Sequence, residues 1–357
     1  MNINKGFFLA GAAILAATLA HGGITYTCDP SVTAATCNYL NTTIAGQYNS
    51  TFSNANATIY VQYGTTGLAQ STTGYDNQVS YANYVAALAA NTNMSTIDQQ
   101  ALLALAANDF TPYGSGNVDI TSALASALGI AGEVINGNTG ITGPGGSPCT
   151  AGSLGCYNGV ITMSNAPNTW YYDNLGGTET GSQYDFYGAL EHETDEILGT
   201  SSCINTTGVS LNDGCPGAST PSAADLFRYS APGSLILDSS PSTTPGAYFS
   251  YNGGTTNGAI GIGGSPKFYN TLNNGDDYAD YISSSPDCGT NQAVQDAEGC
   301  PGEDAGVNIL NDGGSEINVL NAVGYDLKSS LATPEPGTMG LLGAGLTMLA
   351  FVVRRRR

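Results

Sequence analysis

Eight cysteines, arranged in four close couples, constrain the fold of this 357-residue chain more than any other feature. Each couple lies in a segment rich in Gly, Asn and Ser, where a short loop closes easily. An even number of cysteines in an exported chain indicates disulfides rather than free thiols. Metal binding is the alternative, but no couple has the C-x-x-C spacing of a zinc site. We therefore predict four local disulfides, Cys28–Cys37, Cys149–Cys156, Cys203–Cys215 and Cys288–Cys300.

The first twenty residues have the pattern of a secretory signal. Lys5 precedes an apolar run that begins at Gly6 and ends in small residues at Ala20, as in signal peptides before their cleavage site. A membrane anchor is the alternative, and the shortness of the run disfavours it. We predict that signal peptidase removes residues 1–20.

The C-terminal residues 334–357 form a second targeting segment. Pro334-Glu-Pro336 precedes an apolar run that ends at Val353, and four arginines follow. The run is at the lower limit for crossing a bilayer, and the arginines favour the cytoplasmic side. The segment resembles the PEP-CTERM sorting signal of Gram-negative bacteria. The resemblance implies processing by an exosortase-type enzyme near Pro334, transient anchoring in the inner membrane through this helix alone, and a final location at the cell surface or outside the cell.

Removal of both ends leaves residues 21–333 as a strongly acidic domain. It holds 3 basic residues, Arg228, Lys267 and Lys328, and 27 acidic ones, a net charge of −24. This charge excludes nucleic acid and anionic membrane surfaces as partners. Its carboxylates must be solvated, hydrogen-bonded or bound to cations, and Ca²⁺ is one candidate ion. The loops at 274–278 and 311–315 are rich in Asn, Asp and Gly, but neither matches an EF-hand loop.

Apolar spacing predicts a mixture of helices and strands without a regular βαβ alternation, which favours an α+β fold. We expect polar or Gly-rich loops at 64–74 and 136–158. The predicted strands are residues 57–63 and 159–164, and the predicted helices are residues 42–54, 75–91, 95–108, 121–132, 184–199 and 315–323.

The predicted helix at 184–199 carries the most informative motif, His192-Glu-Thr-Asp-Glu196. Positions i and i+4 share one face of a helix, so His192 and Glu196 can bind one metal ion, with Glu193 beside them. This is the H-E-x-x-H arrangement of zinc metalloproteases, with Glu in place of the second His. A surface helix turn with several acids is the alternative. The other histidine, His21, falls at the predicted cleavage region and is a poorer ligand candidate.

The chemistry expected of such a site is peptide hydrolysis. Zn²⁺ held by three protein groups lowers the pKa of a bound water to ~7, and Glu193 would accept its proton as general base. A carboxylate ligand at Glu196 makes the ion less electrophilic than a second imidazole would, and favours a harder metal.

A third ligand must come from another part of the chain. Ser202 occupies the position of the third metzincin histidine, which excludes three-histidine coordination. We predict Asp225 as the third ligand, with an N-cap role as the alternative. Arg228 and Tyr229 are candidates for binding a substrate carboxylate or the oxyanion. The structural alternative for Arg228 is to hold Asp225 or another carboxylate in place.

Four segments, residues 184–199, 225–233, 247–257 and 317–326, resemble exported bacterial metalloproteases of the zincin type, many of which bear PEP-CTERM tails. The resemblance implies a metzincin-like α+β fold, one zinc ion and a protein or peptide substrate. It also implies that strand 159–164 is the edge against which the substrate lies. The alternative is a surface or biofilm-matrix protein that keeps a zincin fold and a structural metal ion without catalysis, which the missing histidines favour.

Overall fold

The structure is a computed structural model. It describes residues 22–91, 93–108, 116–130, 140–143, 147–150, 153–167, 169–172, 181–205, 208–209, 215, 220–237, 246–261, 264–270, 277–282, 292–302 and 314–328. The predicted signal peptide and the predicted C-terminal helix lie outside these residues. Within them, no helix is both long enough and apolar enough to cross a membrane.

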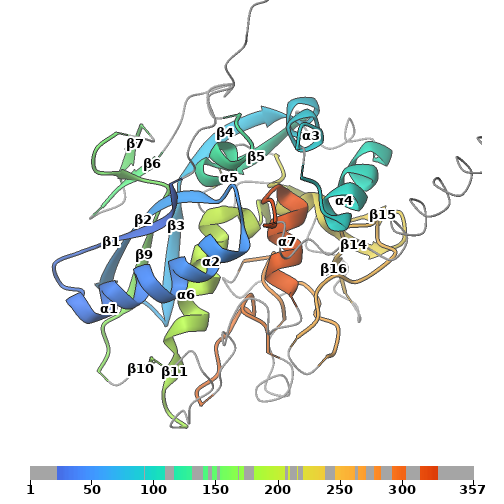
Figure 1. Ribbon diagram of the computed structural model, residues 1–357. Coiled ribbons are helices and arrows are strands. Elements are labelled where there is room, and N and C mark those ends of the chain that lie inside the picture. Colours follow the sequence, from blue (N-terminus) through green and yellow to red (C-terminus); the bar gives the residue numbers. More distant parts are fainter. Residues whose placement is uncertain are drawn as a thin grey trace, which may run out of the picture.

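A four-stranded sheet with the order β1-β2-β9-β3 organises the fold (Figure 1). β1 (Gly23–Cys28), β2 (Asn56–Gly64) and β9 (Gly159–Ser164) run parallel, and β3 (Ala69–Thr73) pairs antiparallel with β9. β9 is therefore an inner strand, because it pairs with β2 on one side and with β3 on the other. β3 is at the edge of this sheet.

These pairings correct two predictions. The edge strand is β3 and not residues 159–164, and residues 64–74 contain a strand instead of forming only a loop. The sequence of β3, Ala-Gln-Ser-Thr-Thr, has no buried residue. It therefore lacks the alternation of apolar and polar residues by which a half-buried strand is recognised.

Helices cover one face of the sheet (Figure 1). A helical segment formed by α1 (Ala34–Tyr39), the π-helical turn η1 (Leu40–Ile44) and α2 (Ala45–Thr51) packs beside α6 (Phe186–Asp195). This segment begins earlier than the predicted helix at 42–54. The Tyr48 hydroxyl donates to the Asp195 carboxylate at 2.6 Å, which ties α2 to α6 inside the core.

The opposite face of the sheet is covered in part by a small sheet of β6 (Gly140–Thr142), β7 (Pro148–Cys149) and β8 (Cys156–Tyr157). Tyr60 and Val160 of the large sheet form a separate apolar cluster with Ile141. Residues 136–158, predicted as a loop, therefore contain three short strands.

The remaining elements lie around this centre. α4 (Thr96–Ala107) has Ser95 as its N-cap residue, and Ser95 forms a capping box with Asp98. α4 packs on α7 (Ser315–Val323). The predicted helix at 75–91 is instead a strand followed by a helix, and the Ser80 side chain caps that helix. The other elements are β4 (Tyr75–Ser80), α3 (Tyr81–Ala89), β5 (Asn117–Thr121), α5 (Ser122–Ala127), β10 (Trp170–Tyr171), β11 (Tyr184–Asp185), η2 (Glu196–Thr200), β12 (Ile204–Asn205), β13 (Gly208–Val209), η3 (Ala224–Phe227), β14 (Arg228–Ala231), β15 (Ser234–Leu235) and β16 (Tyr248–Phe249).

The predicted α+β class is confirmed, and so are the three predicted disulfides that lie wholly within the described residues. The fold is a mixed α+β fold, and the bonds Cys28–Cys37, Cys149–Cys156 and Cys203–Cys215 are present. Cys300 is also disulfide-bonded. Its predicted partner, Cys288, lies outside the described residues.

Candidate metal centre

The motif lies on α6, whose two ends are set by specific residues. The Asp185 carboxylate accepts hydrogen bonds from the backbone N–H groups of Tyr187 and Gly188, at 2.8 and 2.9 Å, and so caps the helix. Leu190 and Ile197 are fully buried and hold one side of the helical segment against the core. Gly199 has a φ of 128°, which other residues rarely adopt, so the chain leaves the helical path there.

Three side chains of the types that bind metal ions converge on this helix. The His192 Nε2 atom lies 3.7 Å from Glu196 Oε1 and 3.6 Å from Asp280 Oδ1. One ligand atom from each of the three residues lies within 4.8 Å of the other two. The expected pairing of His192 with Glu196 at i and i+4 is thus present, and Asp280 completes a group of three.

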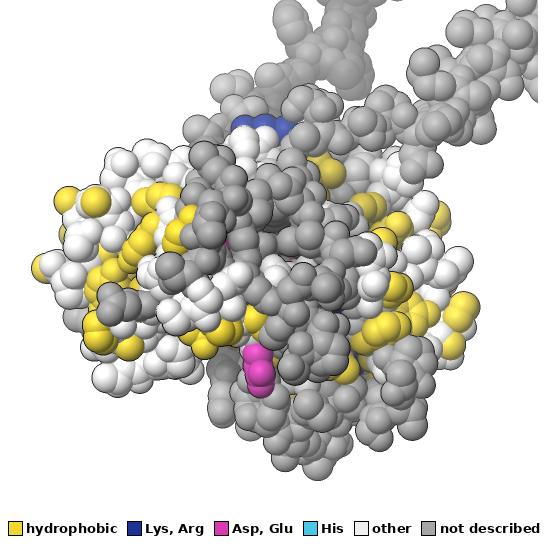
Figure 2. Space-filling view, turned by 90° about the horizontal axis from the view of Figure 1, so that it is seen from below, with side chains coloured by type: hydrophobic (Ala, Val, Ile, Leu, Met, Phe, Trp, Pro, Cys, Tyr) yellow, Lys and Arg dark blue, Asp and Glu magenta, His cyan; other side chains and the backbone are white. Residues whose placement is uncertain are grey.

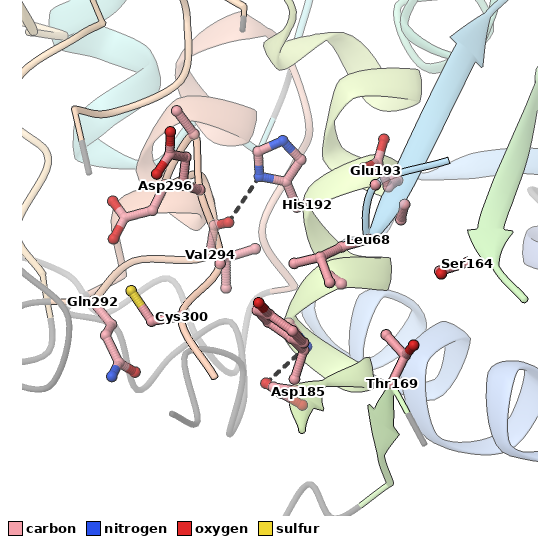
Figure 3. Close-up of a pocket in the computed structure, with 18 of the residues that line it drawn as sticks. Leu68, Ser164, Thr169, Asp185, His192, Glu193, Gln292, Val294, Asp296 and Cys300 are labelled. Atoms are coloured by element: carbon pink, nitrogen blue, oxygen red, sulfur yellow. Dashed lines mark hydrogen bonds between the residues drawn. The ribbon is translucent and has the colours of Figure 1, made fainter. Parts of the chain in front are cut away.

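Hydrogen bonds fix the orientation of two of these side chains. His192 Nδ1 donates to the carbonyl oxygen of Val294 at 2.9 Å (Figure 3). His192 Nε2 is the ring nitrogen that lies near the carboxylates of Glu196 and Asp280. The Ser71 hydroxyl, on β3, donates to Glu196 Oε2 at 2.5 Å, which leaves Oε1 directed at His192. A second hydrogen bond of this kind, made by the atom that does not bind the ion, is typical of metal ligands.

The pKa values of the two glutamates, Glu193 and Glu196, shift in opposite directions. Burial acts to raise the pKa of Glu196, but the hydrogen bond and charge of His192 lower it below its usual value. Burial raises the pKa of Glu193 well above its usual value, and the Glu196 carboxylate adds to this. Burial acts to lower the pKa of His192, but Asp280 and Glu196 raise it well above its usual value. Glu196 is therefore suited to be an anionic ligand, and Glu193 to accept a proton.

The donor set fits a divalent cation. Two carboxylates balance the charge of the ion, and one imidazole with two carboxylates supplies the three protein ligands that a catalytic zinc site needs. The same set is compatible with harder divalent ions. His192 and Glu196 are largely buried, with 15% and 14% of their side chains exposed, so solvent reaches the site only from one side.

The predicted third ligand, Asp225, is not part of this group. One of its oxygens accepts from the Ser202 hydroxyl at 2.5 Å, and the other accepts from the backbone N–H groups of Cys203 and Ser222 at 2.9 and 2.8 Å. Asp225 is the second residue of the short helix η3, and its hydrogen bonds join Ser222, just before this helix, to the chain that leaves the motif. The N-cap alternative is wrong as well, because the N-cap position of η3 is Ala223.

The described contacts of Arg228 and Tyr229 lie away from the group of three ligands. Arg228 is buried and donates to the carbonyl oxygens of Tyr278 at 2.6 Å and of Asn270 at 3.3 Å. Its guanidinium lies over the Tyr269 ring, 4.9 Å from the centroid. The hydroxyl of Tyr229 accepts a hydrogen bond from the Asn108 amide at 2.9 Å. Neither residue lines the cavity beside His192.

Asp280 is the residue that sequence reasoning missed. The preceding stretch, residues 274–278, attracted notice only as a loop rich in Asn and Asp. Of that stretch the structure describes Asp277 and Tyr278; Asp277 accepts from the backbone N–H of Ser202 at 2.9 Å and from that of Ala279 at 2.7 Å. It thereby shapes the turn that presents Asp280 to the helix.

The segment that orients His192 is held from two other sides. Asp296 forms an ion pair with Lys267 at 2.6 Å, and 2% of the lysine side chain is exposed. The backbone N–H of Gln295 donates to Glu316 of α7 at 3.1 Å. The two buried cations, Arg228 and Lys267, therefore stabilise the two loops that complete the site.

A cavity of about 690 Å³ opens beside His192, and both His192 and Glu193 line it (Figure 3). One wall comes from β3 and the residues before it, including Leu68, and another comes from Gln292–Cys300. Volumes of about 300–1,000 Å³ are usual for ligand pockets. The candidate metal centre thus faces a space large enough for part of a substrate.

The family model for the PEP-CTERM protein-sorting motif matches residues 332–357. The chain carries a bacterial protein-sorting signal. The protein is therefore exported and directed to the cell surface, and an exosortase-type sorting enzyme is the partner that recognises the motif. No curated protein and no solved structure matches the chain.

Proposed function

We propose that this exported protein is a zincin-like metal-dependent endopeptidase. In this proposal His192, Glu196 and Asp280 bind one zinc ion, and Glu193 is the general base. The observation that supports it is the convergence of three ligand atoms within 4.8 Å of one another, beside a large cavity that His192 and Glu193 line.

Each side chain of the site has a distinct role in the proposed reaction. A bound zinc ion supplies a Lewis acid for the scissile carbonyl group and acidifies water. Glu193 takes a proton from the attacking water and passes it to the leaving amine. The Val294 carbonyl keeps His192 Nε2 directed at the ion, and Ser71 does the same for Glu196.

The edge strand β3 supplies a place for the substrate backbone. Among the described strands β3 pairs only with β9, and its Ser71 touches Glu196. An extended peptide that pairs with the outer edge of β3 would therefore pass the metal centre, as in other cases of strand addition. β3 takes the role that the sequence had suggested for residues 159–164.

The targeting steps complete the proposal. Signal peptidase removes residues 1–20, and exosortase processing near Pro334 releases residues 21–333 from transient anchoring in the inner membrane of a Gram-negative cell. The sorting motif at residues 332–357 supports the exosortase step.

Metal content and cleavage of a protein substrate test the function. We expect about one zinc ion per purified molecule, cleavage that a chelator abolishes and zinc restores, and loss of cleavage in Glu193→Gln with its metal retained. Asp29→Asn, which also removes one carboxylate but lies away from the cavity, is the matched control. Bound metal without chelator-sensitive cleavage would support the alternative, a non-catalytic surface protein with a structural ion. Purified protein that binds no divalent metal would refute both.

A further inference from the structure

The cavity beside the metal centre is placed to receive a substrate side chain. His192 and Glu193 line it together with residues that flank the edge strand, such as Leu68 and Ala69. A peptide that lies along β3 with its scissile bond at Glu193 would direct a neighbouring side chain into this space. The cavity therefore selects the residue next to the cleaved bond, provided that the proposed function holds.

The walls leave room for a long side chain. Many of the lining residues are small, among them Gly67, Ala69, Ala166, Gly188, Ala189 and Ala293. The larger apolar groups, such as Leu68, Tyr184 and Val294, can contact the methylene groups of an extended side chain. The volume of about 690 Å³ would be left mostly empty by Ala or Ser.

The charge of the lining has one sign. Besides Glu193 it includes Asp185, Asp296 and Glu298, and neither Lys nor Arg is among the lining residues that the structure describes. Asp185 is directed at the start of α6 and Asp296 is paired with Lys267. Glu298 is exposed where the cavity meets solvent. Figure 2 shows an exposed acidic group near the middle of the face seen from below, with Lys and Arg only at its upper rim.

We propose that this cavity is a specificity pocket for a basic side chain, lysine or arginine, of the peptide substrate. The stem of the side chain packs between the small and apolar walls, and its charged end reaches Glu298. Acidic side chains are disfavoured, because the described lining holds several carboxylates and neither Lys nor Arg.

Binding and cleavage of matched peptides test this specificity. The probes are fluorescent peptides that differ at one position next to the scissile bond and carry Arg, Lys, Met or Glu there. Binding is measured by anisotropy on zinc-loaded Glu193→Gln, and cleavage on the zinc-loaded wild type. We expect Arg and Lys to be preferred over the neutral Met, and Glu to bind at least about tenfold more weakly than Arg.

Glu298→Gln isolates the contribution of the pocket's charge. Because Glu298 is exposed, we expect the preference for Arg over Met to fall by about two- to fivefold, and to reverse in Glu298→Lys. Asp29→Asn is the control for a general loss of negative charge and should change neither ratio. Equal binding of the Arg, Met and Glu peptides, or an unchanged Arg preference in Glu298→Lys, would overturn the proposal. Selective binding of basic peptides without any cleavage would support the pocket and refute the enzyme.

Discussion

Arg228 donates a hydrogen bond of 2.6 Å to the carbonyl oxygen of Tyr278, two residues before Asp280. The same guanidinium binds the carbonyl of Asn270 and lies over the ring of Tyr269. A planar group with several fixed donors can join two stretches of backbone in this way, whereas an ammonium group cannot reproduce the geometry. The arginine is therefore a positioning residue for the proposed ligand Asp280.

Arg228→Lys should weaken metal binding while the protein still folds. Loss of a hydrogen bond to a metal ligand typically costs about 10- to 100-fold in metal affinity. Arg228 holds the backbone before Asp280, so we expect a loss at the lower end of this range, about tenfold. Chelator competition measures the affinity, and circular dichroism of the metal-free protein confirms folding. Lys328→Met removes an exposed cation that donates to the Asn49 carbonyl, and it should leave the affinity unchanged. Wild-type affinity in Arg228→Lys would show that the loop is positioned without it.

Asp280→Asn should change metal binding, whereas Asp225→Asn should change stability. The first removes a proposed anionic ligand, so we expect metal binding to be lost and the metal-free stability to be nearly unchanged. The second weakens a buried carboxylate that accepts three hydrogen bonds, and we expect it to lower the free energy of unfolding by about 1–3 kcal/mol while metal still binds. Urea unfolding in chelator and metal titration separate the two quantities. Loss of metal from Asp225→Asn in a folded protein, with retention in Asp280→Asn, would restore the ligand set predicted from the sequence.

Ser71→Ala tests whether the edge strand orients Glu196. Without the hydroxyl, the Glu196 carboxylate loses the partner of its second oxygen, and we expect metal affinity to fall by about tenfold or more. Thr72→Ala on the same strand changes an exposed side chain and should have no such effect. Equal affinities for the two variants would show that Glu196 is oriented by other contacts.

The local parts of the site were predictable from the sequence. Asp185 as a cap, the shared face of His192 and Glu196 and the turn at Gly199 all follow from helical geometry within a few residues. Ser95, at which the predicted helix 95–108 begins, is a local signal of the same kind. Signals of this kind are short-range, because hydrogen bonds within one turn determine them.

The long-range parts were not predictable in the same way. Asp280 reaches His192 only because Asp277 and Arg228 shape a loop far along the chain from the motif. Asp225 stands in a local pattern that suited a ligand and an N-cap equally, and tertiary packing gave it neither place. β3 was missed because a polar edge strand owes its conformation to pairing with β9 and not to its own sequence pattern.

The pH dependence of stability should report a second acidic site, near the end of α7. Asp326 is half-buried, and burial together with the charge of Asp98 raises its pKa to about 6, although Asn91 donates a hydrogen bond to it. The folded protein therefore holds this proton more tightly than the unfolded chain, whose Asp has a pKa of about 3.8. Stability from this group is present at low pH and is lost as the pH rises from about 4 to 6.

The Asp326→Asn variant has no ionisable group at this position, so it lacks this contribution to the change of unfolding free energy with pH. We expect the difference in unfolding free energy between pH 4.5 and 7 to be smaller in the variant by about 1 kcal/mol, because solvent screens a partly exposed carboxylate. Urea unfolding at both pH values measures it. Asp29→Asn is the control, since hydrogen bonds from Ser31 lower the pKa of Asp29 and place its titration below this window. If the unfolding free energy of Asp326→Asn changed with pH as it does in the wild type, Asp326 would be ionised in the native protein throughout this range.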